Sequence, residues 1–311
     1  MRVTIKLNCR NMKPNFFIIG AQKSASTLVQ ACLAEHPEVF LVPGEIPFFE
    51  NPDYVQGNLS SFESLFNNVS TEKAVGIKRP NYYAKPEVPE RLHSYCPDAK
   101  LILVLRNPVE RAISAYFHHI KSGLMPVEDL EQGMNKIING EYQNTYKIAE
   151  EIIDFGFYHK HLLGYLNYFD RSQIHISFFE DFRKNSLEAI TNIFNFLEIE
   201  QDCVPESLNR QAKAGVYSLP RLKFLNMRNQ LLYTYNEDKT RLFVKNQNIV
   251  ESVIAQIIAK FDSMVMSKIW TNDKPKLNSN LNKSLVEIYQ NDIDALARLI
   301  GRDLENWKQF A

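Results

Sequence analysis

Short apolar runs alternate with amphipathic stretches along much of this chain. Phe16 to Ile19 are all aromatic or β-branched, and Leu101 to Leu105 form the strongest run of this kind. Continuous apolar runs of this length are typical of parallel strands that are buried on both faces. Helical patterns follow, in Leu28 to Leu33 and in the stretch that runs to about Lys121. The pattern predicts an α/β fold with a central parallel sheet flanked by helices.

The remaining pattern extends this prediction along the chain. Further strands are expected from Val75 and at Ile174 to Phe179, and helices at Ser186 to Leu197 and Leu285 to Ile300. Gly301 is a good C-cap for the last helix. We expect an N-terminal extension at 1–14 and a single domain over 15–311, in which 229–284 is a possible helical insertion.

The turn after the first strand has the composition of an anion-binding site. In this turn, GAQKSAST (Gly20 to Thr27, called the anion turn below), Lys23 supplies a cation and Ser24, Ser26 and Thr27 supply hydroxyl groups. A turn of small residues that enters a helix presents unpaired N–H groups and the positive end of the helix dipole. The alternative is an ordinary βα connection. The common nucleotide P-loop is disfavoured because Gln22, rather than glycine, precedes Lys23.

Two further strand ends carry cations. Lys78 and Arg79 follow the strand that begins at Val75, and Arg106 follows Leu105. Carboxyl ends of strands are where open α/β sheets build their sites. Arg106 alone is best interpreted as a surface residue. Together with the first turn, and with the hydroxyl of Ser114, it indicates a second clamp for a doubly anionic ligand.

Two carboxylates flank two aromatic residues in the loop EIPFFE, close in sequence to the anion turn. Glu45 and Glu50 are either solvated loop acids or a general base beside the anion site. In the second case we expect apolar neighbours to set the pKa of the base.

The composition excludes few classes of function. The 311 residues carry a formal net charge of zero, so neither a nucleic acid nor a membrane partner is expected. The four cysteines form no C-x-x-C pair, which disfavours a zinc site. The N-terminus shows no apolar signal segment, so the expected location is cytoplasmic. The oligomeric state is left open.

Taken together, these residues resemble the sulfotransferase family that uses 3′-phosphoadenosine 5′-phosphosulfate (PAPS). The likeness is greatest to the branch of heparan-sulfate and other carbohydrate sulfotransferases. That branch carries a loop G-x-x-K-[ST]-G-T-[TS] followed by L-x-x-H-P, to which GAQKSAST and Leu33 to Pro37 are similar. Ala25 replaces the usual glycine: a negative φ there keeps the loop backbone accessible, whereas a positive φ restricts it. The 3′-phosphate motif L-R-[DN]-P-x-x-R-x-x-S-x-Y matches Leu105 to Tyr116 at every stated position.

Weaker motifs extend the resemblance. E-x-x-F-F matches Glu45 to Phe49, with Pro47 where glucosaminyl enzymes often have histidine, which suggests a different acceptor. The motif [EK]-K-[ST]-P-x-Y matches loosely at Ile77 to Tyr82, [YF]-E-D-[LF] matches Phe179 to Phe182, and a C-terminal pattern matches Tyr289 to Trp307.

The resemblance implies a P-loop-like fold and a metal-independent transferase. Such an enzyme moves the sulfuryl group of PAPS to a hydroxyl or amine of a small-molecule or carbohydrate acceptor and leaves adenosine 3′,5′-bisphosphate. Lys23, Glu45 and Lys78 would be catalytic, with Glu45 as general base. The implied cofactor-binding residues are Gln22, Lys23, Ser24, Ala25, Ser26, Thr27, Arg106, Ser114, Lys213 and Arg221. A non-catalytic nucleotide-binding relative and a P-loop phosphoryl transferase remain as alternatives.

Overall fold

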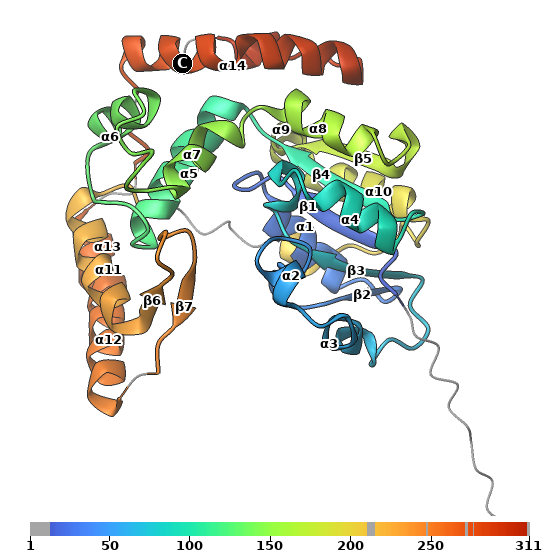
Figure 1. Ribbon diagram of the computed structural model, residues 1–311, viewed down its shortest axis with the longest axis horizontal. Helices are drawn as coiled ribbons and strands as arrows, with labels where there is room; N and C mark the ends of the chain where they lie inside the picture. Colours follow the sequence, from blue (N-terminus) through green and yellow to red (C-terminus); the bar gives the residue numbers. More distant parts are fainter. Residues whose placement is uncertain (1–12, 210–214, 247, 271–272, 276, 310–311) are drawn as a thin grey trace, which may run out of the picture. The chain divides into compact units, whose positions relative to one another are not determined.

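The computed structural model describes residues 13–209, 215–246, 248–270, 273–275 and 277–309 (Figure 1). The chain forms two compact units, one from Met1–Arg106 and Lys160–Gln211 and the other from Asn107–His159 and Ala212–Ala311. Most of the expected N-terminal extension, and Lys213, lie outside the described residues.

The first unit contains a five-stranded parallel sheet in the order β2-β3-β1-β4-β5. The central strand β1 (Phe16–Gly20) pairs with β3 (Ala74–Lys78) and with β4 (Lys100–Leu105). The edge strands are β2 (Val39–Leu41) and β5 (Ile174–Phe178). The predicted sheet is confirmed, although β2 was not predicted, because a three-residue strand has too short an apolar run to stand out.

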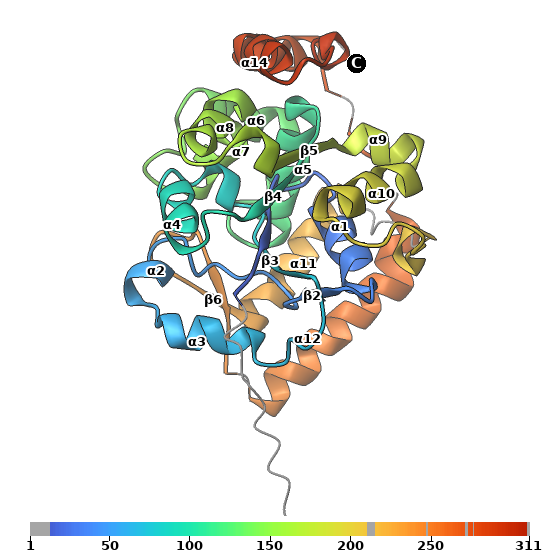
Figure 2. The same ribbon diagram turned by 90° about the vertical axis from the view of Figure 1, so that its right-hand side faces the viewer.

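Helices cover both faces of this sheet (Figure 2). Alternate strand residues such as Phe16, Ile18 and Ile102 pack against α1 (Ser26–Ala34) and α10 (Ser186–Leu197) in one continuous apolar core. The other face of the sheet lies toward α4 (Val88–Tyr95), as the edge-on view shows. The remaining helices of the unit are α2 (Asp53–Gln56), α3 (Leu59–Glu63), α9 (Phe179–Lys184) and most of α8 (Tyr158–Leu166).

The second unit is mainly helical. Its helices are α5 (Pro108–Lys121), α6 (Leu130–Ile138), α7 (Ile148–Asp154), α11 (Leu219–Leu232), α12 (Ile249–Phe261), α13 (Ser267–Ile269) and α14 (Ser279–Ile300). Within the segment 229–284, which was expected to be a helical insertion, β6 (Tyr233–Tyr235) and β7 (Leu242–Val244) form an antiparallel hairpin. The side chain of Asn236 organises its turn by accepting hydrogen bonds from the N–H groups of Thr240 and Arg241 at 2.9 and 2.8 Å.

Several motif residues of the second unit hold its helices together. Arg111 on α5 is completely buried, and its Nη2 donates to the carbonyl of Ile152 on α7. The hydroxyl of Tyr289 on α14 donates to the carbonyl of Ile153 at 3.0 Å. Burial raises the pKa of this tyrosine to about 12, although nearby Arg111 acts in the opposite direction. These residues therefore have structural roles.

The histidine of the L-x-x-H-P motif has a structural role in the first unit. His36 is 2% exposed, and its ring packs edge-on against Phe194 with 4.8 Å between the ring centroids. Its Nδ1 accepts from the N–H of Glu38 at 3.1 Å, so Nε2 carries the proton and donates to the carbonyl of Glu200 at 2.8 Å. The ring thereby joins the chain after α1 to the chain after α10.

Among the described residues, the structure has no helix with the length and apolar character needed to cross a membrane.

We expect His36→Ala to lower the free energy of unfolding by about 2–4 kcal/mol, because it leaves two partly buried backbone groups unpaired and creates a cavity. Urea denaturation would measure the loss. The control His118→Ala changes an exposed residue and should cost less than about 0.5 kcal/mol. Equal losses in both variants would contradict the role assigned to His36.

Candidate functional site

Three strand ends meet at the carboxyl edge of the sheet. β1 lies between β3 and β4, so the chain leaves the sheet in different directions on the two sides of β1. Such a switch point is where open α/β sheets bind ligands. Here β1 leads into the anion turn, β3 ends at Lys78, and β4 is followed by Arg106. Nζ of Lys78 donates to Oγ1 of Thr27 at 3.1 Å, and Nη1 of Arg106 donates to the carbonyl of Lys23 at 3.3 Å.

The anion turn has an unusual backbone. Lys23 and Ala25 both have positive φ, at 68° and 76°. Ala25 is the N-cap of α1, and no side chain caps this helix end. Its carbonyl accepts from the N–H groups of Leu28 and Val29. The N–H groups of the first turn before Leu28 have no partner within the helix. The sequence left the sign of φ at Ala25 open, and the observed positive φ is the alternative that restricts the loop backbone.

The turn also contains a buried hydroxyl. Ser24 is completely buried, and its Oγ hydrogen-bonds to none of the described residues. Gln22 donates through Nε2 to Oδ1 of Asn81 at 3.3 Å. Buried polar groups normally have partners, so an unpaired hydroxyl in a turn of this kind fits a ligand with acceptor oxygens.

The carboxyl end of β3 carries a four-membered ion cluster. Lys78, whose side chain is 3% exposed, lies 3.2 Å through Nζ from Oε1 of Glu45. Arg79 donates through Nη1 to Oε2 of Glu45 at 3.1 Å. It also holds Glu50 with two bonds, Nε to Oε1 at 2.6 Å and Nη2 to Oε2 at 2.8 Å. Burial alone would lower the pKa of Arg79, but Glu50 and Glu45 hold it above its usual value.

This cluster corrects one expectation from the sequence. Glu45 was expected to have apolar neighbours that set its pKa. Instead, the contacts of its carboxylate are two cations, and its side chain is 43% exposed. The two acids of the loop also differ, because the side chain of Glu50 is only 2% exposed and pairs with Arg79, whose side chain is 18% exposed.

The loop that carries Glu45 is fixed to the end of β3. The N–H of Ile46 donates to the carbonyl of Lys78 at 3.0 Å. The hydroxyl of Tyr82 donates to the carbonyl of Ile46 at 2.5 Å and accepts from the N–H of Phe49 at 3.1 Å. Burial raises the pKa of this tyrosine, which keeps its hydroxyl protonated as a donor. Glu45 therefore sits in a loop with a defined path.

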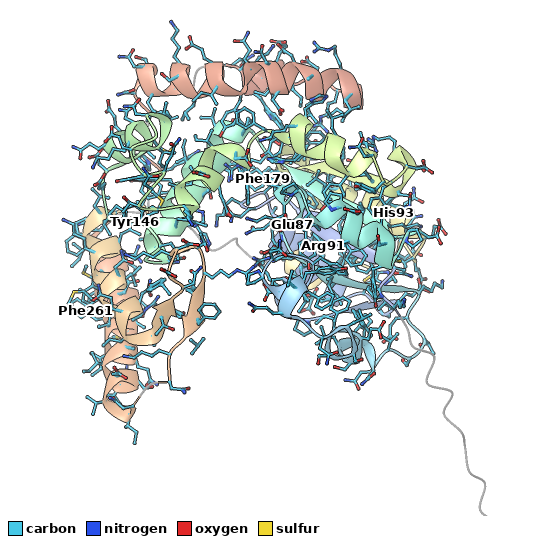
Figure 3. The ribbon with its side chains drawn as sticks, viewed as in Figure 1. Glu87, Arg91, His93, Tyr146, Phe179 and Phe261 are labelled. Carbon is cyan, nitrogen blue, oxygen red and sulfur yellow. The ribbon has the colours of Figure 1, made fainter. Side chains whose placement is uncertain are left out.

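The same loop forms part of a pocket of about 370 Å³. Aromatic side chains dominate its wall, and Arg91 stacks on Tyr54 with its Cζ 4.3 Å from the ring centroid. Figure 3 labels Arg91, which lies on α4. The lining residues are Phe48, Phe49, Tyr54, Gly57, Leu59, Arg91, Ser94 and Tyr95.

The remaining predicted site residues have different surroundings. Arg106 is half-buried, and its Cζ lies 4.5 Å from the ring centroid of Phe179, which Figure 3 labels. Ser114 lies half-buried on α5, in the second unit. Arg221, also in that unit, is buried and bound by two hydrogen bonds to Asp262, both at 2.9 Å. The cofactor roles assigned to these three residues stay predictions, as does that of Lys213.

Sequence reasoning missed the supporting residues of the site. Tyr82 and Phe179 were noted only as motif positions, and the Arg79–Glu50 pair was not anticipated. A signal was present for Tyr82, because it is the tyrosine of the loosely matched [EK]-K-[ST]-P-x-Y motif. No sequence signal connects Arg79 with Glu50, because the pairing depends on how the two loops fold.

Comparisons with known proteins agree with the family resemblance. A family model described as the sulfotransferase domain matches residues 13–295. The human bifunctional heparan sulfate N-deacetylase/N-sulfotransferase 2 is 32% identical over 197 residues, which are 60% of this chain and 22% of that protein. The human heparan sulfate glucosamine 3-O-sulfotransferase 6 is 31% identical over 167 residues, which are 52% of this chain and 46% of that protein. The matches thus span less than half of either relative.

A solved structure has the same fold. The sulfotransferase from Alicyclobacillus acidocaldarius aligns with a TM-score of 0.68 at 21% identity, over 96% of this chain and 100% of that chain. The predicted fold class is therefore confirmed.

We expect Ala25→Gly to raise the free energy of unfolding by about 0.5–1 kcal/mol. Left-handed backbone costs a non-glycine residue roughly 1–2 kcal/mol, which the greater flexibility of unfolded glycine partly offsets. The matched control Ala31→Gly, within α1, should lower the same free energy by about 0.5–1 kcal/mol. Urea denaturation compares the two. A similar loss in both variants would show that Ala25 does not carry this strain.

Proposed function

Because this chain belongs to the sulfotransferase domain family, we propose that it moves the sulfuryl group of PAPS to a hydroxyl or amine of a carbohydrate or small-molecule acceptor. One observation carries the proposal. An uncapped helix N-terminus and the paired Lys78 and Glu45 meet at the switch point of the sheet, where Thr27 and Glu45 share the same ammonium group. The family match runs through both units, which are thus parts of one domain.

The residues of the anion turn suit the phosphosulfate of the donor. Lys23, the N–H groups at the start of α1 and the unpaired hydroxyl of Ser24 are donors that an anion can use. When bound, the donor supplies the sulfuryl group and a phosphate leaving group. We assign Lys23 to the charge that develops on the departing phosphate, and Arg106 to the 3′-phosphate, which a guanidinium can grip through two hydrogen bonds.

Glu45 is suited to the proton transfer. Its carboxylate is partly exposed and is oriented by Lys78 and Arg79. We propose that it takes the proton of the acceptor hydroxyl or amine while Lys78 stabilises charge near the sulfuryl group. Sulfuryl transfer makes demands similar to those of phosphoryl transfer, so positioning and electrostatic stabilisation would supply most of the rate.

The surroundings of Glu45 bear on the acceptor. Lys78 and Arg79 are matched by the carboxylates of Glu45 and Glu50, so these two cations give the cluster no net positive charge. They therefore do not by themselves favour an anionic glycan.

We predict that adenosine 3′,5′-bisphosphate binds to the purified chain and that ATP and AMP bind far more weakly. Arg106→Ala should weaken the bisphosphate by roughly 10- to 100-fold, since hydrogen bonds to charged groups contribute about 1.5–3 kcal/mol. Isothermal titration measures both effects, with Arg171→Ala as a control at the opposite edge of the sheet. A preference for ATP would refute the donor assignment and favour phosphoryl transfer.

Lys23→Ala and Glu45→Gln should each lower turnover by roughly 10²–10³, the usual cost of one well-placed electrostatic group, and leave the fold intact. Transfer of ³⁵S from labelled PAPS to N-desulfated heparin or 4-nitrophenol would measure turnover. The controls are Lys73→Ala and Glu198→Gln, which change exposed members of surface ion pairs. Bisphosphate binding without transfer in the wild type would indicate a non-catalytic relative.

A further inference from the structure

Arg79 hydrogen-bonds to two carboxylates that differ in their exposure to solvent. Glu50 is buried and accepts two of its hydrogen bonds, whereas Glu45 is 43% exposed and accepts one. We propose that Arg79, anchored by Glu50, is a positioning residue that holds Oε2 of Glu45 and leaves Oε1 to accept the proton. The inference rests on the proposed function of Glu45 as general base.

The anchor leaves Arg79 little freedom. The side chain of Glu50 is 2% exposed, and a buried carboxylate is strongly destabilised without a partner of opposite charge. Its two bonds to Nε and Nη2 fix one edge of the guanidinium. Because the group is planar, they also fix the direction in which Nη1 points. Glu45 therefore faces a hydrogen-bond donor with a set position.

Backbone hydrogen bonds also fix the chain at Arg79 and in the loop that carries Glu45 and Glu50. The N–H of Arg79 donates to the carbonyl of Ile18 on β1 at 3.0 Å, which continues the sheet pairing past the end of β3. The N–H of Glu50 donates to the carbonyl of Pro47 at 2.8 Å. The hydroxyl of Tyr82 hydrogen-bonds to the backbone of Ile46 and of Phe49, which lie on either side of Pro47. The base and its positioning residue are thus tied to one strand end.

Lys78 and Arg79 differ in what they can do. Nζ of Lys78 lies 3.1 Å from Thr27 in the anion turn and 3.2 Å from Oε1 of Glu45. An ammonium on a flexible stem can turn toward a bound anion, whereas a guanidinium held at two points cannot. When Lys78 turns toward the donor, Oε1 loses its cation and Oε2 keeps Arg79.

The resulting step is balanced. The acceptor O–H or N–H bond breaks, and its proton goes to Oε1 of Glu45. The electron pair of the acceptor atom forms the new bond to sulfur. The bond from sulfur to the bridging oxygen breaks, and its electrons leave with the phosphate. Arg79 touches none of the reacting atoms and acts only through Glu45.

The test follows the titration of Glu45 itself by ¹³C NMR of the full chain labelled at its glutamate carboxyl carbons, with the Glu45 signal identified by its loss in Glu45→Gln. In the part of the chain that the structure describes, Lys78 and Arg79 contact Glu45, Glu50 and Tyr82 lie next to Arg79, and Asp53 lies next to Tyr82. In Arg79→Gln, the midpoint of Glu45 should move to higher pH, because the variant loses a cation that lies 3.1 Å from Oε2 and favours the ionised form. Arg79→Lys keeps the cation and should stay near the wild type.

Two variants separate this role from general destabilisation. The double variant Arg79→Leu and Glu50→Leu removes both members of the ion pair together, which a fold tolerates better than one unpaired buried charge. It should show a smaller shift of Glu45 in the same direction. Arg171→Gln removes an arginine at the start of β5 and should leave the midpoint unchanged. An unchanged midpoint in both the Arg79→Gln protein and the double variant would overturn the proposal.

Kinetics give a second readout. In the ³⁵S transfer assay, Arg79→Gln and Glu50→Gln should each lower turnover at least tenfold. Water serves as the acceptor if no other acceptor is used. The affinity for adenosine 3′,5′-bisphosphate should stay within twofold of the wild type in both. Wild-type turnover in Arg79→Gln would also overturn the proposal. The NMR result does not depend on transfer, so failure of the wild type to bind bisphosphate refutes the proposed function separately.

Discussion

The buried ammonium of Lys78 imposes the constraint on which the site depends. A lysine whose side chain is 3% exposed is tolerated only with polar partners for its charge, and the structure supplies them from two directions. Thr27 comes from the start of α1, and Glu45 comes from the loop that follows β2. Satisfying this one group therefore brings the anion turn and the proposed base together. The strand order makes the meeting possible, because β3 neighbours β1 in the sheet.

The anion turn keeps unpaired hydrogen-bond donors at a cost in local stability. A side chain at the N-cap of α1 would satisfy the first N–H groups and stabilise the helix, but Ala25 has no such group and adopts a positive φ. The hydroxyl of Ser24 is likewise buried with no partner among the described residues. Strain and unpaired donors of this kind persist where the surrounding structure enforces them. Here the packing of α1 against the sheet does so.

Local patterns predicted the elements well, and the tertiary pairings poorly. The helix at Ser186–Leu197 was predicted with its observed bounds, because its apolar positions follow one helical face. The β6–β7 hairpin was not predicted, since all of β7 is exposed and no alternation of buried and exposed residues marks it. The strand ends with Lys78 and Arg106 were visible as cations after apolar runs. The partner of Arg79 was not, because Glu50 lies in a separate loop whose path depends on Tyr82.

A motif match does not by itself separate residues that bind from residues that fold. In the match from Leu105 to Tyr116, the side chain of Asn107 caps α5 by accepting from the N–H groups of Val109 and Glu110. Tyr116 is 1% exposed and donates to backbone carbonyls, while Arg111 is completely buried. Only a partly exposed guanidinium can reach a ligand, and of the two arginines in this motif that is Arg106. The same burial argument assigns Glu50 to the framework and leaves Glu45 for chemistry.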